Sequence, residues 1–152
     1  MSLHRSLKTK SGALNQHRNV LTRAERTPDE LIALIQKAKK QVRVPVSTGE
    51  IWNIWLEQPK LVRAVDFMAV HILPYWEGVA PDQAVAYTLD KIELLKRTYP
   101  GKRIVVTEFG WPSQGYNRLD AAPSQLSQAE IIRDFVAEAE RRGIEYNIIE
   151  AF

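Results

Sequence analysis

The residues from 104 to 111 combine an apolar strand, a carboxylate and an aromatic side chain. The run Ile104–Val106 leads to Glu108, and Trp111 follows three residues later. A carboxylate at the carboxyl end of a buried parallel strand lies where barrel enzymes hold their catalytic groups. The flat apolar face of an aromatic residue can stack on a sugar ring. The motif therefore predicts a glycoside-cleaving nucleophile at Glu108.

Three further predicted strands also end on an ionisable residue. Glu50, His71 and Glu150 each follow an apolar or β-rich run, as Glu108 does. The carboxyl ends of parallel strands lie on one side of a barrel, so we expect these four side chains to share a face. Any one of them alone would be interpreted as a helix cap or a solvated charge, but the four together favour an active face.

Aromatic residues gather in the same predicted loops, and all four tryptophans of the chain are among them. Trp111 and Trp76 are the better candidates for stacking on a sugar. Trp55, at helical spacing from Trp52, is expected to pack in the core. The predicted substrate-binding residues are Glu50, Trp52, His71, Tyr75, Trp76, Trp111 and Glu150.

Other kinds of chemistry have less support in the sequence. His71 with the carboxylates Glu50, Glu108 and Glu150 has no recognisable metal-ligand spacing, so we expect no metal site. The chain has neither the G-x-S-x-G motif of serine hydrolases nor a glycine-rich phosphate loop. We expect no cofactor.

Helical and strand patterns alternate from residue 27 onwards. Capping boxes at Thr27–Glu30 and at 127–130 mark two helix starts, and Gly143 marks a helix end. The predicted helices are 27–40, 51–63 with a break near Pro59, 81–98 and 127–142, the predicted strands are 42–47, 64–70, 103–107 and 144–149, and a loop covers 111–125.

This alternation predicts the α/β fold class with a parallel sheet. Strands that alternate with helices favour right-handed crossovers between parallel neighbours. The strands are mostly apolar on both faces, as strands covered on both sides are. We therefore expect a single folded unit built from β-α repeats.

Composition limits the class of protein and the partners. Of 152 residues, 45% are hydrophobic and 26% charged, which is typical of a globular chain. Residues 1–26 hold six basic residues and one acid, and removing these from the totals leaves 15 basic and 17 acidic residues in 27–152. The basic excess is therefore confined to a predicted tail, and we expect no nucleic-acid partner. The chain shows no secretory signal, no membrane segment and no cysteine, so its location stays open.

Four motifs in order resemble a known family. The sequence Val-Thr-Glu-Phe-Gly-Trp-Pro-Ser at 106–113 resembles the nucleophile motif of glycoside hydrolase family 17, the β-1,3-glucanases. The segments 48–52, 70–76 and 146–152 resemble its fifth, sixth and eighth strand ends. The resemblance covers roughly residues 23–152 and is greatest to the bacterial branch of glucan hydrolases and glucosyltransferases.

The resemblance implies a fold and a reaction. It implies strands five to eight, with their helices, of a (β/α)8 TIM barrel, and a retaining mechanism on β-1,3-glucan. Glu108 would be the nucleophile, Tyr75 would help to position it, and Trp111 would line the sugar cleft. Intact relatives are expected at the cell envelope.

The chain also departs from the family pattern. The family places its acid/base glutamate after an asparagine at the end of strand four, and this chain has His17-Arg18-Asn19-Val20 there. Strands one to three and the final helix have no counterpart, so we expect a truncated C-terminal half barrel at 23–152. Residues 1–22 are expected to be a basic leader, disordered or unrelated to the family.

Three hypotheses about function stay open. The first is a retaining β-1,3-glucan enzyme with impaired or no activity, since the acid/base is missing and Glu50 and Glu150 are not expected to replace it. The second is a non-catalytic carbohydrate-binding remnant. The third is a structural half barrel that self-associates through its open sheet edges.

Overall fold

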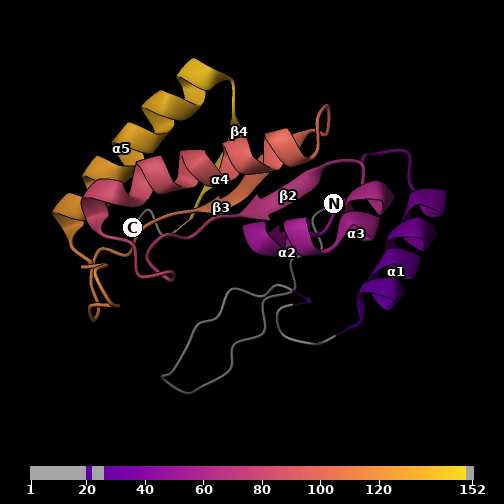
Figure 1. Ribbon diagram of the computed structural model, residues 1–152, viewed down its shortest axis with the longest axis horizontal. Helices are drawn as coiled ribbons and strands as arrows, with labels where there is room; N and C mark the ends of the chain where they lie inside the picture. Colours follow the sequence, from indigo (N-terminus) through magenta and orange to yellow (C-terminus); the bar gives the residue numbers. More distant parts are fainter. Residues whose placement is uncertain (1–19, 22–25, 150–152) are drawn as a thin grey trace.

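The computed structural model describes residues 20–21 and 26–149, and their helices and strands alternate as predicted (Figure 1). The four strands pair in the order β1-β2-β3-β4, and every pairing is parallel. The predicted α/β class and parallel sheet are therefore confirmed. The elements are α1 (Pro28–Gln41), β1 (Gly49–Ile51), α2 (Trp52–Glu57), α3 (Pro59–Ala64), β2 (Met68–His71), the 3-10 turn η1 (Pro81–Gln83), α4 (Ala84–Thr98), β3 (Ile104–Phe109), α5 (Gln125–Arg142) and β4 (Glu145–Ile148).

The helix ends confirm one predicted capping box and correct the other. At α1, the Thr27 hydroxyl accepts from the Glu30 amide at 3.3 Å, and the Glu30 carboxylate accepts from the Thr27 amide at 2.8 Å. At α5, Ser124 is the cap and accepts from the Ser127 amide at 3.0 Å. The helix therefore starts before Ser127, whose own amide is already used in the first turn. Gly143 ends α5 in the left-handed conformation, as predicted.

The first strand lies later in the chain than the prediction of 42–47. The segment before β1 is held largely by polar contacts with the residues that lead into β2. Val46 donates its amide to the Asp66 carboxylate at 2.7 Å, and the Ser47 hydroxyl donates to the Phe67 carbonyl at 2.5 Å. These contacts occupy polar groups that a longer strand would use, so the ladder itself spans only Gly49–Ile51.

Helices α4 and α5 lie side by side along one face of the sheet (Figure 1). Their apolar stripes cover that face, and the Phe109 ring of β3 stacks on Phe135 of α5 at 3.8 Å between centroids. Val70 of β2 and Val106 of β3 are fully buried. Since the pleat alternates, the residues next to these valines point to the opposite face of the sheet.

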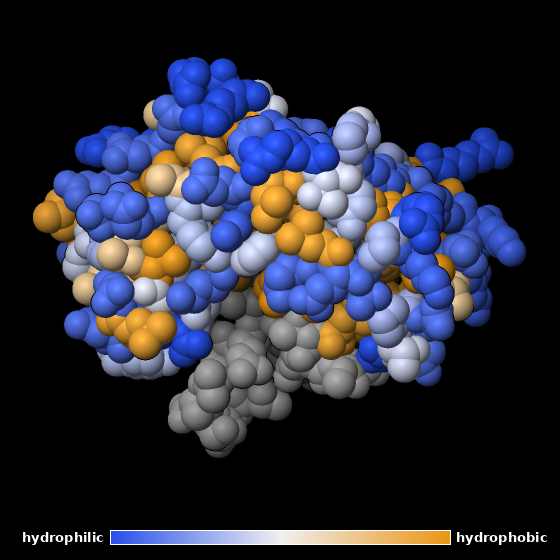
Figure 2. Space-filling model, in the orientation of Figure 1, coloured by the Kyte–Doolittle hydropathy of each residue, from blue (hydrophilic) through white to orange (hydrophobic). Residues whose placement is uncertain are grey.

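The helix-bearing side is mainly hydrophilic, with small and scattered hydrophobic patches (Figure 2). Within the part of the chain that the structure describes, no helix has the length and apolarity to cross a bilayer. The expected boundary between a leader at 1–22 and a folded unit at 23–152 stays a prediction, since residues 1–19 and 22–25 lie outside the described part.

Candidate active site

A β-bulge in β3 sets the direction of Glu108. Val106 is paired with Val70 of β2, but the next pair joins Glu108 to His71, so β3 holds one residue more than β2 in this interval. The pairing with β4 shifts in the same way between Val106 and Phe109. In a regular strand Glu108 would share the buried face of Val106, whereas the extra residue turns it to the face of His71. The Glu108 side chain keeps 22% of its surface exposed there.

His71 contacts Glu108 across the β2–β3 pair. Its Nδ1 atom lies 3.3 Å from Glu108 Oε2, and its side chain is buried. The other side of the imidazole lies against β1, where a Cβ on Gly49 would come within 2.5 Å of His71 Nε2. The His71 ring therefore lies between Gly49 of β1 and Glu108 of β3, although His71 itself pairs in register with Ile51. Of the four predicted strand-end groups, the structure brings His71 and Glu108 into contact.

Glu50 is fully buried, but it belongs to a different environment. It pairs with Val70, so strand alternation directs it away from the face of Gly49. Its Oε1 accepts from the Leu21 amide at 3.2 Å, and its Oε2 has no hydrogen-bond partner among the described residues. Burial raises the pKa of Glu50 to about 7, against the hydrogen bonds from the Leu21 and Val20 amides. The structure does not place Glu50 beside the His71–Glu108 pair.

The two tryptophans of α2 are both engaged in structure. Trp55 is fully buried, and its indole N–H lies 3.2 Å from the Glu50 carbonyl and 3.3 Å from the Ala69 carbonyl. Its predicted packing role is confirmed. Trp52 donates to the Glu77 carboxylate at 3.1 Å, and Lys91 Nζ lies 4.4 Å from its ring centre. Its polar group and one ring face are therefore used between α2, α4 and the loop after β2.

Trp111 is buried in the structure, and its expected role in stacking on a sugar stays a prediction. None of its side chain is exposed. Tyr75, itself buried, packs edge-on against it at 5.8 Å between ring centres, and Gln128 of α5 donates to its backbone carbonyl at 2.8 Å. The ring therefore packs within the hydrophobic core of the described residues.

The loops after β2 and β3 are joined to each other. The Tyr75 hydroxyl donates to the Tyr116 carbonyl at 2.8 Å, and Arg118 donates to the carbonyl of Trp76. Trp76 is half-buried, and Tyr116 is 60% exposed, so these two rings are the ones that retain open surface here. Arg118 and Gln128 were not predicted, because a single polar residue in a loop or on a helix leaves no periodic pattern.

Two of the sequence predictions concern residues outside the described part of the chain. Glu150 lies outside the described residues, as do three of the four residues, 17–19, that stand at the expected acid/base position. Their contribution to the site stays a prediction.

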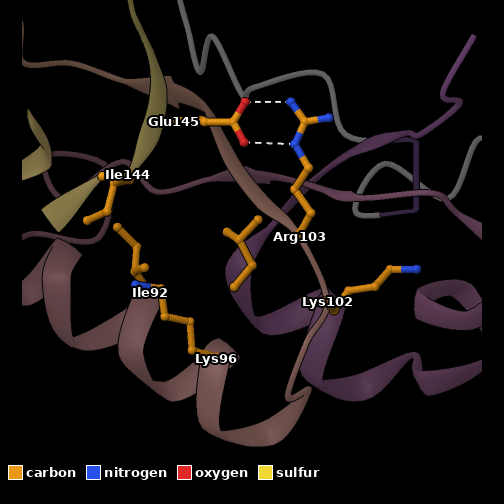
Figure 3. Close-up of a pocket in the computed structure, with 8 residues that line it drawn as sticks. Ile92, Lys96, Lys102, Arg103, Ile144 and Glu145 are labelled. Atoms are coloured by element: carbon orange, nitrogen blue, oxygen red, sulfur yellow. Dashed lines mark hydrogen bonds and ion pairs between the residues drawn. The ribbon is translucent and has the colours of Figure 1, made fainter.

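The described residues contain no group of three or more His, Asp or Glu side chains close enough to hold a metal. A pocket of about 220 Å³ does exist, at the other end of the sheet (Figure 3). It lies where β3 and β4 begin, and Arg103 and Glu145 form its rim together with Lys96 and Lys102 of α4 and the following turn. It is therefore separate from the strand ends that carry His71 and Glu108.

Comparison with known proteins identifies the family of the chain. The domain model of the BtgE/BtgC glycoside hydrolases matches residues 18–152. The chain is 30% identical over 130 residues to the probable glucan endo-1,3-beta-glucosidase btgC of Aspergillus fumigatus, which covers 75% of this chain and 18% of that protein. It is 30% identical over 119 residues to the glucan 1,3-beta-glucosidase of Schizosaccharomyces pombe, covering 72% and 36%.

Solved structures also share the fold of this chain. The family 17 β-1,3-glucanosyltransferase of Rhizomucor miehei superimposes with a TM-score of 0.80 at 26% identity, over 86% of this chain and 50% of that one. An endo-laminarinase from Formosa shares the fold at 17% identity, with a TM-score of 0.61. The four-stranded sheet corresponds to about half of the neighbours' TIM barrel.

The chain spans well under half the length of the curated relatives named above. Their fungal origin leaves the resemblance to a bacterial branch as a prediction. The chain belongs to glycoside hydrolase family 17, with the BtgE/BtgC glycoside hydrolase domain.

Proposed function

We propose that this chain carries the nucleophile half of a retaining β-1,3-glucan site, with Glu108 as the nucleophile. One observation carries the proposal: the β3 bulge turns Glu108 out of the core and onto His71, while part of its side chain stays exposed. A retaining glycosidase needs such a carboxylate to attack the anomeric carbon. The names of the relatives, glucosidases and a glucanosyltransferase on β-1,3-glucan, supply the substrate class.

We further propose that turnover by these 152 residues is impaired or absent. A retaining enzyme uses a second carboxyl about 5–5.5 Å from the nucleophile to protonate the leaving oxygen. At the position where the family resemblance implies this residue, the sequence has no glutamate. Glu50 is buried and directed to the other face of the sheet. Loss of a general acid typically costs about 10²–10⁴-fold in rate.

The experiment separates attack from protonation. An aryl 2-deoxy-2-fluoro-β-glucoside with a dinitrophenyl leaving group needs little acid assistance and leaves a long-lived glycosyl-enzyme. We expect one glycosyl unit per chain by intact mass, placed on Glu108 by peptide sequencing. Glu108→Gln should not be labelled, whereas Glu130→Gln, on the exposed side of α5, should be labelled like the wild type.

Two results would count against this function. Labelling of another residue, or of none, would reject Glu108 as a working nucleophile. Hydrolysis of laminarin-type glucan at the rate of an intact glycosidase would reject the proposed impairment.

We also propose that copies of the chain self-associate along the sheet edges. Among the described residues, β1 pairs with β2 alone and β4 pairs with β3 alone, so each outer strand has one side without a strand partner. Unpaired edges favour association with another strand. Sedimentation velocity over a range of concentrations should show dimers or larger species, and a monomer at all concentrations would contradict the proposal.

A further inference from the structure

The imidazole of His71, on β2, contacts the strands on either side, β1 and β3. On the β1 side, a Cβ built on Gly49 would lie 2.5 Å from His71 Nε2 and 2.8 Å from its Cε1. On the β3 side, Nδ1 lies 3.3 Å from Glu108 Oε2. The ring thus reaches from the backbone of β1 to the carboxylate on β3, and presents a different nitrogen to each strand.

We infer that His71 is the positioning residue of Glu108, and that Gly49 is a glycine because the imidazole must lie against β1 to reach it. The inference rests on the proposed role of Glu108 as nucleophile. A glycine inside a strand weakens the strand and marks a place where another group approaches closely. Here the approaching group is the ring of His71, and the backbone of Gly49 has no left-handed conformation that would explain the residue otherwise.

The chemistry of the two groups fixes the direction of the contact. Nδ1 and Oε2 are in ion-pair contact at 3.3 Å, and because an ionised carboxylate can only accept, this contact favours a proton on Nδ1. When the ring is neutral, a proton favoured at Nδ1 leaves Nε2 unprotonated on the side of β1. His71 is buried, with 7% of its surface exposed, so the ring has little freedom to turn away. A displacement of about 1 Å at a reacting group can cost about 10²-fold in rate.

Two variants of His71 distinguish the nitrogens. The amide nitrogen of asparagine can occupy the place of Nδ1, whereas that of glutamine extends toward the place of Nε2. We expect His71→Gln to slow the trapping of Glu108 by the fluoroglucoside by about 10²-fold at saturating reagent. His71→Asn should keep most of the rate. Equal rates in the wild type and both variants would overturn the inference.

Gly49 provides a double-mutant test. Gly49→Ala places a methyl group against Nε2 and must displace the ring, so we expect a loss of trapping rate similar to that of His71→Gln. In the His71→Asn background the ring is gone, and the added methyl should have little further effect. The same loss from Gly49→Ala in both backgrounds would indicate damage to β1 itself, and would overturn the role assigned to the glycine.

A spectroscopic measurement keeps the inference separate from the proposed function. With ¹⁵N-labelled histidine at a pH where the ring is neutral, the wild type should show His71 protonated at Nδ1. Glu108→Ala removes the acceptor and should shift the population toward protonation at Nε2. If trapping fails but this shift is found, the contact stands and the proposed function fails. An unchanged tautomer would reject the contact, whatever the trapping result.

Discussion

The two ends of the parallel sheet hold charged residues in opposite ways. Where β3 and β4 begin, Arg103 and Glu145 form a two-point ion pair with N–O distances of 2.7 and 2.5 Å, and both side chains are about half exposed. Where β1 and β3 end, Glu50 is fully buried with one oxygen lacking a described partner, and Glu108 meets His71 at a longer 3.3 Å.

This difference indicates which end is built for chemistry. Ion pairs that are exposed to water cost little in desolvation and contribute little to the free energy of unfolding. A buried carboxylate is costly unless it is fully paired, so its presence at one end points to a functional demand. The pocket in Figure 3 lies at the strand-start end, among paired charges. The chemistry of the side chains, rather than the hollow shape of the surface, therefore locates the candidate site.

The largest expected difference between the two ends of the sheet is the loss of stability when a glycine is replaced by alanine. A Cβ on Gly110, just after β3, would lie 2.0 Å from the Ile149 carbonyl oxygen, whose residue also donates its amide to Phe109 at 2.8 Å. Gly110→Ala must therefore separate β3 from the end of β4, and we expect it to lower the free energy of unfolding by more than about 3 kcal/mol. Urea unfolding followed by circular dichroism measures this.

Gly101, before β3, is the matched control. An alanine there meets no atom within 4 Å, and its cost comes from the positive φ of 77° alone, about 1–2 kcal/mol. If Gly101→Ala proved as harmful as Gly110→Ala, close strand approach would not distinguish the two ends.

The sequence predicted the periodic features of this arrangement and missed the features that depend on register. The strand ending near Glu108 followed from a local apolar run, and α1 followed from its capping box at Thr27. The bulge that turns Glu108 toward His71 depends on the pairing of segments more than thirty residues apart. The close approach of the His71 ring to Gly49 depends in the same way on the pairing of β1 with β2. The burial of Trp111 depends on how its loop folds over it, which residue type alone does not show.

The next effect concerns Glu50 and depends on pH. Its ordinary pKa is 4.5, and burial raises it to about 7 in the folded chain. Between these values the unfolded chain has released the proton while the folded chain keeps it, so the folded state binds more protons. The free energy of unfolding therefore falls as the pH rises from about 4.5 to about 7, and then levels off. The loss is at most about 3.5 kcal/mol, at about 1.4 kcal/mol for each pH unit.

Glu50→Gln keeps the shape and removes the titration. Its Oε1 can still accept from the Leu21 amide, so we expect its stability relative to the wild type to increase from pH 4.5 to 7 and to stay constant above that. Thermal unfolding of both chains across this range measures the difference, and Glu130→Gln controls for the removal of one negative charge. A difference that stays constant over the whole range, or that grows toward low pH, would contradict the burial of a costly carboxylate at this end.

The smallest effect is expected at the opposite end, in the Arg103–Glu145 pair. The geometry of this pair is favourable, with two hydrogen bonds from one guanidinium to one carboxylate, and the pair lowers the pKa of Glu145 chiefly through the side-chain hydrogen bond from Arg103. Both side chains are about half exposed, however, so solvent screens their attraction. We expect Glu145→Gln to cause a small loss of stability that shrinks further in 1 M salt, and to leave the trapping of Glu108 unchanged. A loss as large as that of Gly110→Ala, or one that salt does not reduce, would show that this end also depends on its charges and would remove the contrast between the two ends of the sheet.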